Sequence, residues 1–302
     1  MNLLKKIAGS PEVFAIEFQM NPSQKGPLNE WWGNLWLWVE SRCIGDIQEK
    51  ETVSVGLGSL VTAAHRTGLR ASRLLSSMPA KEALELVMWA VYGEDDSKLE
   101  ELVGSRTTLY PFEVLPASDP FFDDWQAILV EEEDTERFIY RKMNQGVSEV
   151  KWKLGTFKEV ALQAQADFEK IAKLLLADDI VRVVSGEVAR MPHLISQAEI
   201  NHVAEAVPKD QRLLTASAVK RVLTALLHGE ITPAQAQSWA AFVMRGYVPE
   251  KEGVVQPIDI PYQAECEDAI ANAILRLEGL GDAVGGTLDP HELQELIDEL
   301  SE

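Results

Sequence analysis

Residues 31–40 carry apolar side chains at both odd and even positions, which constrains the fold more than any other segment. In an extended chain the tryptophans fall on one face and the aliphatic residues on the other: Trp36 and Trp38, against Leu35, Leu37 and Val39. Because both faces must be covered, we expect a central strand with other structure packed on each side. The alternation in residues 12–20 predicts a neighbouring strand, and residues 22–29 read as the loop between them.

Two helices are expected next. Gly56-Leu-Gly58 reads as a turn, and Ser59 is a candidate N-cap for a helix over residues 60–75. A second helix should follow Pro79, with an apolar stripe at Leu84, Val87, Met88 and Val91.

The pattern then changes to short strands joined by turns. The predicted strands are residues 110–115, 124–130, 137–143 and 147–154, with hairpin turns at 131–135 and 144–146. After Gly155, an apolar stripe from Phe157 to Leu175 predicts a long helix.

From about residue 177 the strand patterns nearly stop. The predicted helices are residues 218–227, 234–243, 266–280 and 291–300. Thr232 and Asp289 each precede a proline, with Gln235 or Glu292 three positions after the cap residue, which is the pattern of a capping box. The sequence therefore predicts an α+β domain over residues 1–176, mostly antiparallel sheet with packed helices, followed by an all-helical domain over residues 177–302.

The charge balance excludes some partners. The chain has 48 acidic and 28 basic residues, a formal net charge of −20. A nucleic-acid-binding surface needs a basic footprint, and anionic lipid attracts basic segments, so neither nucleic acid nor a membrane is an expected partner. A basic protein partner is compatible with this charge, and so is the simpler explanation that acidic surfaces favour solubility.

The remaining composition predicts a cytoplasmic protein. Cys43 and Cys266 lie far apart, which fits free thiols in a reducing compartment. The apolar run at the N-terminus is too short for a signal peptide, and no segment has the apolar length of a membrane span.

No motif for catalysis, a metal or a cofactor stands out. Gly56-Leu-Gly58 is a weak match to a dinucleotide loop, and the five histidines lack zinc-site spacing. The segment 281–292 has the glycine and glutamate of an EF-hand loop but lacks its first three side-chain ligands. We therefore expect no cofactor and no enzyme, although a catalytic site assembled from distant residues stays open as an alternative.

Two acidic runs are the best candidates for a partner surface. Residues 119–136 contain eight acids and no base, and residues 257–302 contain twelve acids and only Arg276. Such runs are often only solvated faces, but carboxylates beside aromatic rings also suit an interface. The candidate partner-binding residues are Asp123, Asp124, Trp125, Glu131, Glu132, Glu133, Asp134, Asp268 and Asp282. At helical spacing, Arg66, Arg70 and Arg73 form either a solvated basic face or internal partners of these acids.

The tryptophan segment also carries a family resemblance. A glycine, an aromatic strand and then Ile-Gly-Asp resembles the N-terminal region of immunity proteins from bacterial polymorphic toxin systems. The matching residues are Glu17, Phe18, Gly33, Trp36, Trp38, Ile44-Gly45-Asp46, Arg137 to Arg141 and Gly155-Thr-Phe157. The resemblance covers roughly residues 10–176 and implies a cytoplasmic protein that binds and neutralises a cognate toxin.

The leading hypothesis is therefore an immunity protein that occludes a basic toxin surface by stoichiometric binding, with carboxylates and aromatic anchors at the contact. The alternative is an intracellular adaptor or chaperone-like protein that binds two partners, one with each domain.

Overall fold

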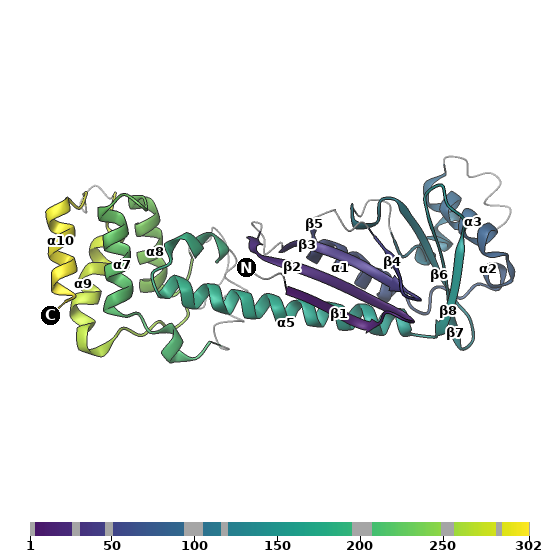
Figure 1. Cartoon of the computed structure of the whole chain (residues 1–302), viewed down its shortest axis with the longest axis horizontal. Coiled ribbons are helices and arrows are strands. Elements are labelled where there is room, and N and C mark those ends of the chain that lie inside the picture. The colour runs from purple at the N-terminus through teal and green to yellow at the C-terminus, as the bar shows by residue number, and fades with distance from the viewer. Residues whose placement is uncertain are drawn as a thin grey trace. The chain divides into compact units, whose positions relative to one another are not determined.

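The computed structural model describes residues 4–25, 31–45, 51–93, 105–115, 120–194, 207–248, 257–281 and 286–301. The described part of the chain divides into two compact units, one up to Lys170 and one from Ile171. The first contains antiparallel sheets with helices and the second is helical, which confirms the predicted fold class (Figure 1). The predicted domain boundary at residue 176 stays a prediction.

The first sheet is built around the tryptophan strand. Its strands are β1 (Leu4–Ser10), β2 (Phe14–Lys25), β3 (Trp31–Val39), β4 (Arg42–Ile44) and β5 (Glu51–Thr52). Their order is β1-β2-β3-β4, β5 also pairs with β3, and all pairs are antiparallel. The central position of β3 matches the prediction. The edge strand β1 was not predicted, because most of its side chains are exposed and leave little apolar alternation.

The two faces of β3 are covered to different extents. Odd positions such as Leu35 pack toward α1 (Val53–His65), and Phe18 of β2 meets Phe168 of α5 (Thr156–Val184) with ring centroids 5.9 Å apart. On the even face Trp36 is buried, Trp38 is half-buried and Trp32 is exposed. Cover is therefore complete on the helical face and partial on the other.

The prediction for the glycine segment is wrong. Helix α1 begins at Val53, so Gly56 and Gly58 lie inside it, and Ser59 donates to Val55 O instead of capping an end. A Cβ on Gly56 would lie 2.7 Å from both Leu35 and Phe121 side-chain atoms. Glycine is needed there for close packing against the sheet rather than for a turn.

The predicted helix over residues 60–75 is also wrong in its second half. Helix α1 stops at His65, and Gly68 adopts a φ of +89°. The chain then forms α2 (Arg73–Ser77) and α3 (Ala80–Tyr92), the latter as predicted after Pro79. Arg66, Arg70 and Arg73 therefore do not share one helical face.

The second sheet contains three of the four strands predicted for this region. Its strands are β6 (Trp125–Glu131), β7 (Thr135–Lys142) and β8 (Ser148–Lys153), joined by two hairpins in the order β6-β7-β8. Residues 110–115 are not a strand but hold the 3-10 turn η2 (Tyr110–Phe112) and a single bridge from Glu113 to Ile128. Two other short turns are η1 (Arg106–Thr108) and η3 (Pro120–Phe122).

The second unit has its own core. It contains the end of α5, then η4 (Val188–His193), η5 (Lys209–Arg212), α7 (Ala216–Leu227), α8 (Pro233–Arg245), η6 (Ala264–Cys266), α9 (Glu267–Glu278) and α10 (Pro290–Glu299). Trp239 is fully buried there and donates to Val183 O at 2.7 Å. The four predicted helices and both predicted capping boxes, at Thr232 and Asp289, are confirmed.

Candidate partner-binding surface

The candidate acids of residues 119–136 fall at opposite ends of one strand. Asp123 and Asp124 directly precede β6, whereas Glu131 to Asp134 lie at its end and in the following turn. A strand of seven residues is about 24 Å long at ~3.4 Å per residue. These acids therefore form two separate patches. Asp119 lies outside the described residues.

Glu131 is turned into the protein. Its side chain is 6% exposed, its Oε2 accepts from Gly68 N at 2.7 Å, and its Oε1 lies 3.7 Å from Arg70 Nη1. The backbone of Glu131 also donates to Arg70 O at 3.0 Å. The sequence left two possibilities for Arg66, Arg70 and Arg73, a solvated basic face or internal partners of the acidic segments. The structure shows that Arg70 is such an internal partner.

Arg70 is a fully buried cation with an incomplete set of partners. Its Nε donates to Pro111 O at 2.8 Å, and its guanidinium carbon lies 5.7 Å from the Phe157 ring centroid. Burial lowers the pKa of Arg70 to about 10, although Glu131 opposes this, so the group is charged at neutral pH. Arg70 Nη1 and Nη2 and Glu131 Oε1 are buried without hydrogen-bond partners within the described ranges.

Glu132 is half-buried and paired. Lys151 Nζ lies 2.7 Å from its Oε2, and Thr135 Oγ1 donates to the same atom at 3.0 Å. Burial alone would raise the pKa of Glu132, but the hydrogen bonds from Lys151 and Thr135 outweigh it and hold that pKa below its ordinary value.

Glu133 and Asp134 are exposed, and neither side chain forms an ion pair in the described part of the protein. Beside them is an open groove of about 930 Å³, which we call the α2 groove. Its lining residues are Ala71, Ser72, Arg73, Ser76, Ser77 and Glu131 to Thr135. The sequence pointed to the acidic side of this groove but missed its serines, because α2 was predicted as part of a longer helix.

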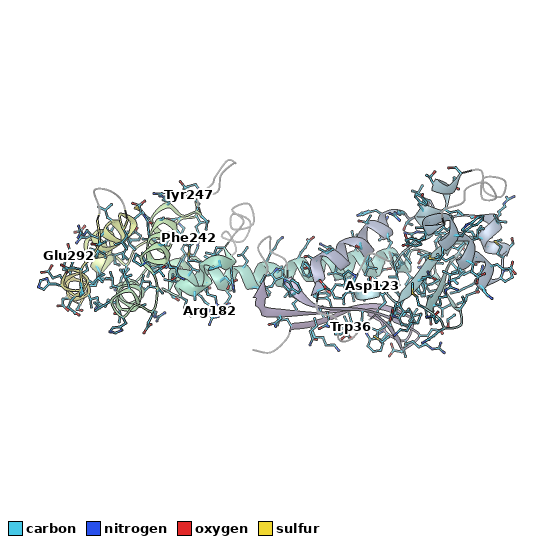
Figure 2. All side chains as sticks on the ribbon, turned by 90° about the horizontal axis from the view of Figure 1, so that it is seen from above. Trp36, Asp123, Arg182, Phe242, Tyr247 and Glu292 are labelled. Carbon is cyan, nitrogen blue, oxygen red and sulfur yellow. The ribbon has the colours of Figure 1, made fainter. Side chains whose placement is uncertain are left out.

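The second patch is smaller. Asp123 and Asp124 are exposed, Trp125 is half-buried, and Lys142 Nζ lies 3.7 Å from Asp124 Oδ2 and 6.0 Å from the Trp125 ring centroid. Figure 2 marks Asp123 in the unit that contains both sheets. Lys142 offsets part of the charge here, and no base pairs with Asp123 within the part of the chain that the structure describes.

Comparison with known proteins shows which family the first unit resembles. The family model described as immunity protein 42 matches residues 7–167. The chain belongs to the immunity protein 42 family. No curated protein matches the chain. A crystal structure of CdiI from Burkholderia dolosa AUO158 is similar at 18% identity, with a TM-score of 0.43, over 54% of this chain and 99% of that chain.

The resemblance found in the sequence is thus confirmed. Several of the residues that carry it have a structural role in the first sheet of this immunity protein 42 family member. Glu17 is buried, accepts from Trp38 Nε1 at 2.9 Å, and pairs with Lys5 Nζ at 2.6 Å. A Cβ on Gly33 would lie 1.8 Å from Gln19 O of the neighbouring strand. These contacts hold the first sheet together. They favour core packing as the role of most of the tryptophan side chains in β3.

The helical unit lies beyond the family match. Asp268 is exposed in the first turn of α9, where a carboxylate also favours the helix dipole. Arg276 pairs with Glu292 at 2.8 Å, and Glu292 is labelled on this unit in Figure 2. Asp282, the other candidate from this region, lies outside the described residues.

No cluster of three metal-ligating side chains occurs within the described ranges. No helix among the described residues is both long and apolar enough to cross a bilayer.

Proposed function

We propose that this protein binds and neutralises a cognate bacterial toxin in the cytoplasm by stoichiometric occlusion, without catalysis. The observation that carries the proposal is membership of the immunity protein 42 family over residues 7–167. Inhibition by occlusion needs a stable complementary surface rather than reactive groups, and the acidic patches of the first unit supply charge for such a surface.

The proposed contact residues are the exposed carboxylates at both ends of β6. Glu133 and Asp134 extend beside the α2 groove, and Asp123 lies at the other end with the half-buried ring of Trp125. Glu131 supports the turn from inside through Arg70 rather than by touching the toxin. A toxin that acts on nucleic acid needs a basic cleft, which these carboxylates would attract.

The test begins with purification of the tagged protein from its native bacterium at low and moderate salt, followed by mass spectrometry. A single partner at one-to-one stoichiometry, whose toxicity in cells is suppressed by co-expression of this protein, is the expected result. A protein that protects no cell from any co-purifying partner would contradict the proposal.

The contact surface is tested separately. Double charge reversal of Glu133 and Asp134 to lysine should slow association at low salt, because steering depends on opposite charge. Glu169→Lys is the matched control, since Glu169 is exposed on α5 of the same unit and its side chain bonds Gln165, with no base paired to it among the described residues. Equal association rates for the double variant and the control would remove the turn from the interface.

A second candidate function is an adaptor that binds two proteins. The observation that favours it is the separate apolar core of the helical unit, which lies outside the family match. Capture of a second protein that is lost only when residues 171–302 are removed would support this function beside the first.

A further inference from the structure

A second hollow of the first unit, of about 380 Å³, is lined by α1 and by residues 113–114, and we call it the α1 pocket. Its lining residues are Val55, Gly58, Ser59, Thr62, Ala63, Arg66, Glu113 and Val114. We infer that this pocket is the seat of a carboxamide side chain of the toxin, an asparagine or a glutamine. The inference rests on the proposed function and deepens it by naming a chemical group of the partner.

The α1 pocket contains one cation and one anion that do not pair with each other. Arg66 Nη1 donates to Tyr110 O at 3.2 Å, and Glu113 accepts a hydrogen bond from the Tyr92 hydroxyl. Neither Arg66 nor Glu113 forms an ion pair in the described part of the chain. Both keep hydrogen-bonding capacity for a ligand, since a guanidinium has five N–H donors and a carboxylate has two oxygens.

The carboxylate of Glu113 has lost part of its water. Burial raises the pKa of Glu113 above its ordinary value, and the Tyr92 hydrogen bond and Arg66 oppose that rise only in part. A carboxylate in this state gains free energy when a ligand N–H reaches it. Because Arg66 lines the same small pocket, one ligand inside it can meet both charges.

The glycine at position 58 supports a ligand independently of these charges. A glycine inside a helix costs about 1 kcal/mol relative to alanine. Close packing on the sheet explains that cost at Gly56, but a Cβ on Gly58 would meet no atom within 4 Å. Since Gly58 lines the α1 pocket, the missing side chain leaves room for a group from outside to approach the helix backbone.

The two charges together select a neutral ligand with a donor and an acceptor at one end. A cationic side chain is repelled by Arg66, and an anionic one is repelled by Glu113. A primary carboxamide carries its C=O and its NH₂ side by side, so it can accept from Arg66 and donate to Glu113 at once. A backbone peptide group points its C=O and N–H in opposite directions and cannot do so from one end. The methylene stem of the ligand would lie against Val55, which is 58% exposed.

The inference can be tested on the full chain without the toxin. The probe is N-acetyl-glutamine methylamide, titrated into 15N-labelled protein, with amide shifts followed at Gly58, Ser59 and Val114. The control ligands are the corresponding glutamate derivative, an anion of nearly the same shape, and the ornithine derivative, a cation of similar length. We expect saturable shifts with a dissociation constant on the order of millimolar for glutamine and at least a tenfold weaker response for both controls. Equal binding of either control would overturn the inference.

Filling the pocket tests its location. Gly58→Leu should weaken glutamine binding at least tenfold without loss of stability, because leucine favours a helix more than glycine does. Lys158→Leu is the matched control, since it adds the same side chain at an exposed position of α5 and should leave binding unchanged. Full binding of glutamine by Gly58→Leu would overturn the inference.

Removing one charge tests the selection. Glu113→Gln keeps an oxygen that can accept from Tyr92, so we expect the variant to fold, and circular dichroism will verify it. With the negative charge gone, Arg66 should invert the preference, so that the glutamate derivative binds more tightly than the glutamine derivative. An unchanged preference for glutamine would contradict the role given to Glu113.

The toxin distinguishes this inference from the function on which it rests. A toxin that binds Gly58→Leu as tightly as the wild type would overturn the carboxamide seat while leaving neutralisation intact. Purification without any toxin, with glutamine-selective shifts still present, would instead contradict the proposed function and leave the α1 pocket as a carboxamide site.

Discussion

Trp152 Nε1 donates a hydrogen bond of 2.7 Å to Oε2 of Glu136, a carboxylate with no exposed surface. The backbone N–H groups of Gly155 and Phe157 donate to the same carboxylate at 3.0 and 2.9 Å. Glu136 therefore ties β7, β8 and the first turn of α5 together. A buried charge is stable in this position because three donors replace its water.

Replacement of this carboxylate should lower the stability of the first unit. Glu136→Ala leaves three buried donors without an acceptor, so we expect the free energy of unfolding to fall by about 3 kcal/mol or more. Urea unfolding followed by tryptophan fluorescence is the measurement, because seven of the eight tryptophans lie at or before residue 152. Glu133→Ala is the control and should change stability by less than about 0.5 kcal/mol, since its side chain is exposed. Similar losses for both variants would contradict the role given to Glu136.

The pair between Arg137 and Glu149 should make stability depend on pH. A hydrogen bond of 2.8 Å from Arg137 lowers the pKa of Glu149 below its ordinary value. Since the pKa is lower in the folded protein, the stabilisation is present above the ordinary pKa and is lost as the pH falls through the folded-state value. At pH 7, Glu149→Gln should lower the free energy of unfolding by about 1 kcal/mol, a modest amount because Glu149 is one-third exposed.

The measurement for this pair is urea unfolding of wild type and variant across a pH series. The difference between them should shrink below about pH 4 as the carboxylate becomes protonated. Glu169→Gln is the control, because Glu169 bonds Gln165 rather than a base. A Glu149 difference that stays constant down to pH 3 would show that charge is not its source.

Sequence patterns predicted those elements whose burial is regular. The strand β3 was found because both of its faces are apolar, and α8 and α10 were found because a cap residue and a proline mark each start. The edge strand β1 and the turn η2 were not predicted, since few of their residues alternate between core and solvent. Local periodicity reports burial, and it fails where an element is held by pairing with its neighbours.

The acidic turn was predicted, but the chemistry around it was not. Sequence reasoning treated all four acids from Glu131 to Asp134 as equivalent. The structure separates them, with Glu131 buried beside Arg70, Glu132 paired with Lys151, and Glu133 and Asp134 exposed without an ion pair among the described residues. This separation depends on a residue more than sixty positions away, so no local pattern could reveal it.

Alanine substitutions at the two glycines of α1 should change stability in opposite directions. A Cβ on Gly58 would meet no atom within 4 Å, so Gly58→Ala should gain helix propensity and raise stability by about 0.5–1 kcal/mol. A Cβ on Gly56 would press on Leu35 and Phe121 at 2.7 Å, so Gly56→Ala should lower stability by roughly 1–3 kcal/mol. Urea midpoints of both variants provide the measurement, and each variant is the control for the other. A gain in both would mean that the sheet can relax away from α1.

The helical unit should need residues 171–176 of α5 for its stability, although the sequence assigned them to the first domain. Leu176 is 4% exposed and packs in the helical core with Ile180 and Val183, so a chain cut after residue 176 loses a core side chain. We expect the fragment 171–302 to melt at least roughly 5 °C above the fragment 177–302, because loss of a buried leucine costs about 2–5 kcal/mol. Thermal circular dichroism of both fragments is the measurement. A variant of the longer fragment with Leu174→Ala is the control, because Leu174 is exposed and its truncation should leave the melting temperature nearly unchanged. Equal melting of the two fragments would place the start of the independent helical core after residue 176.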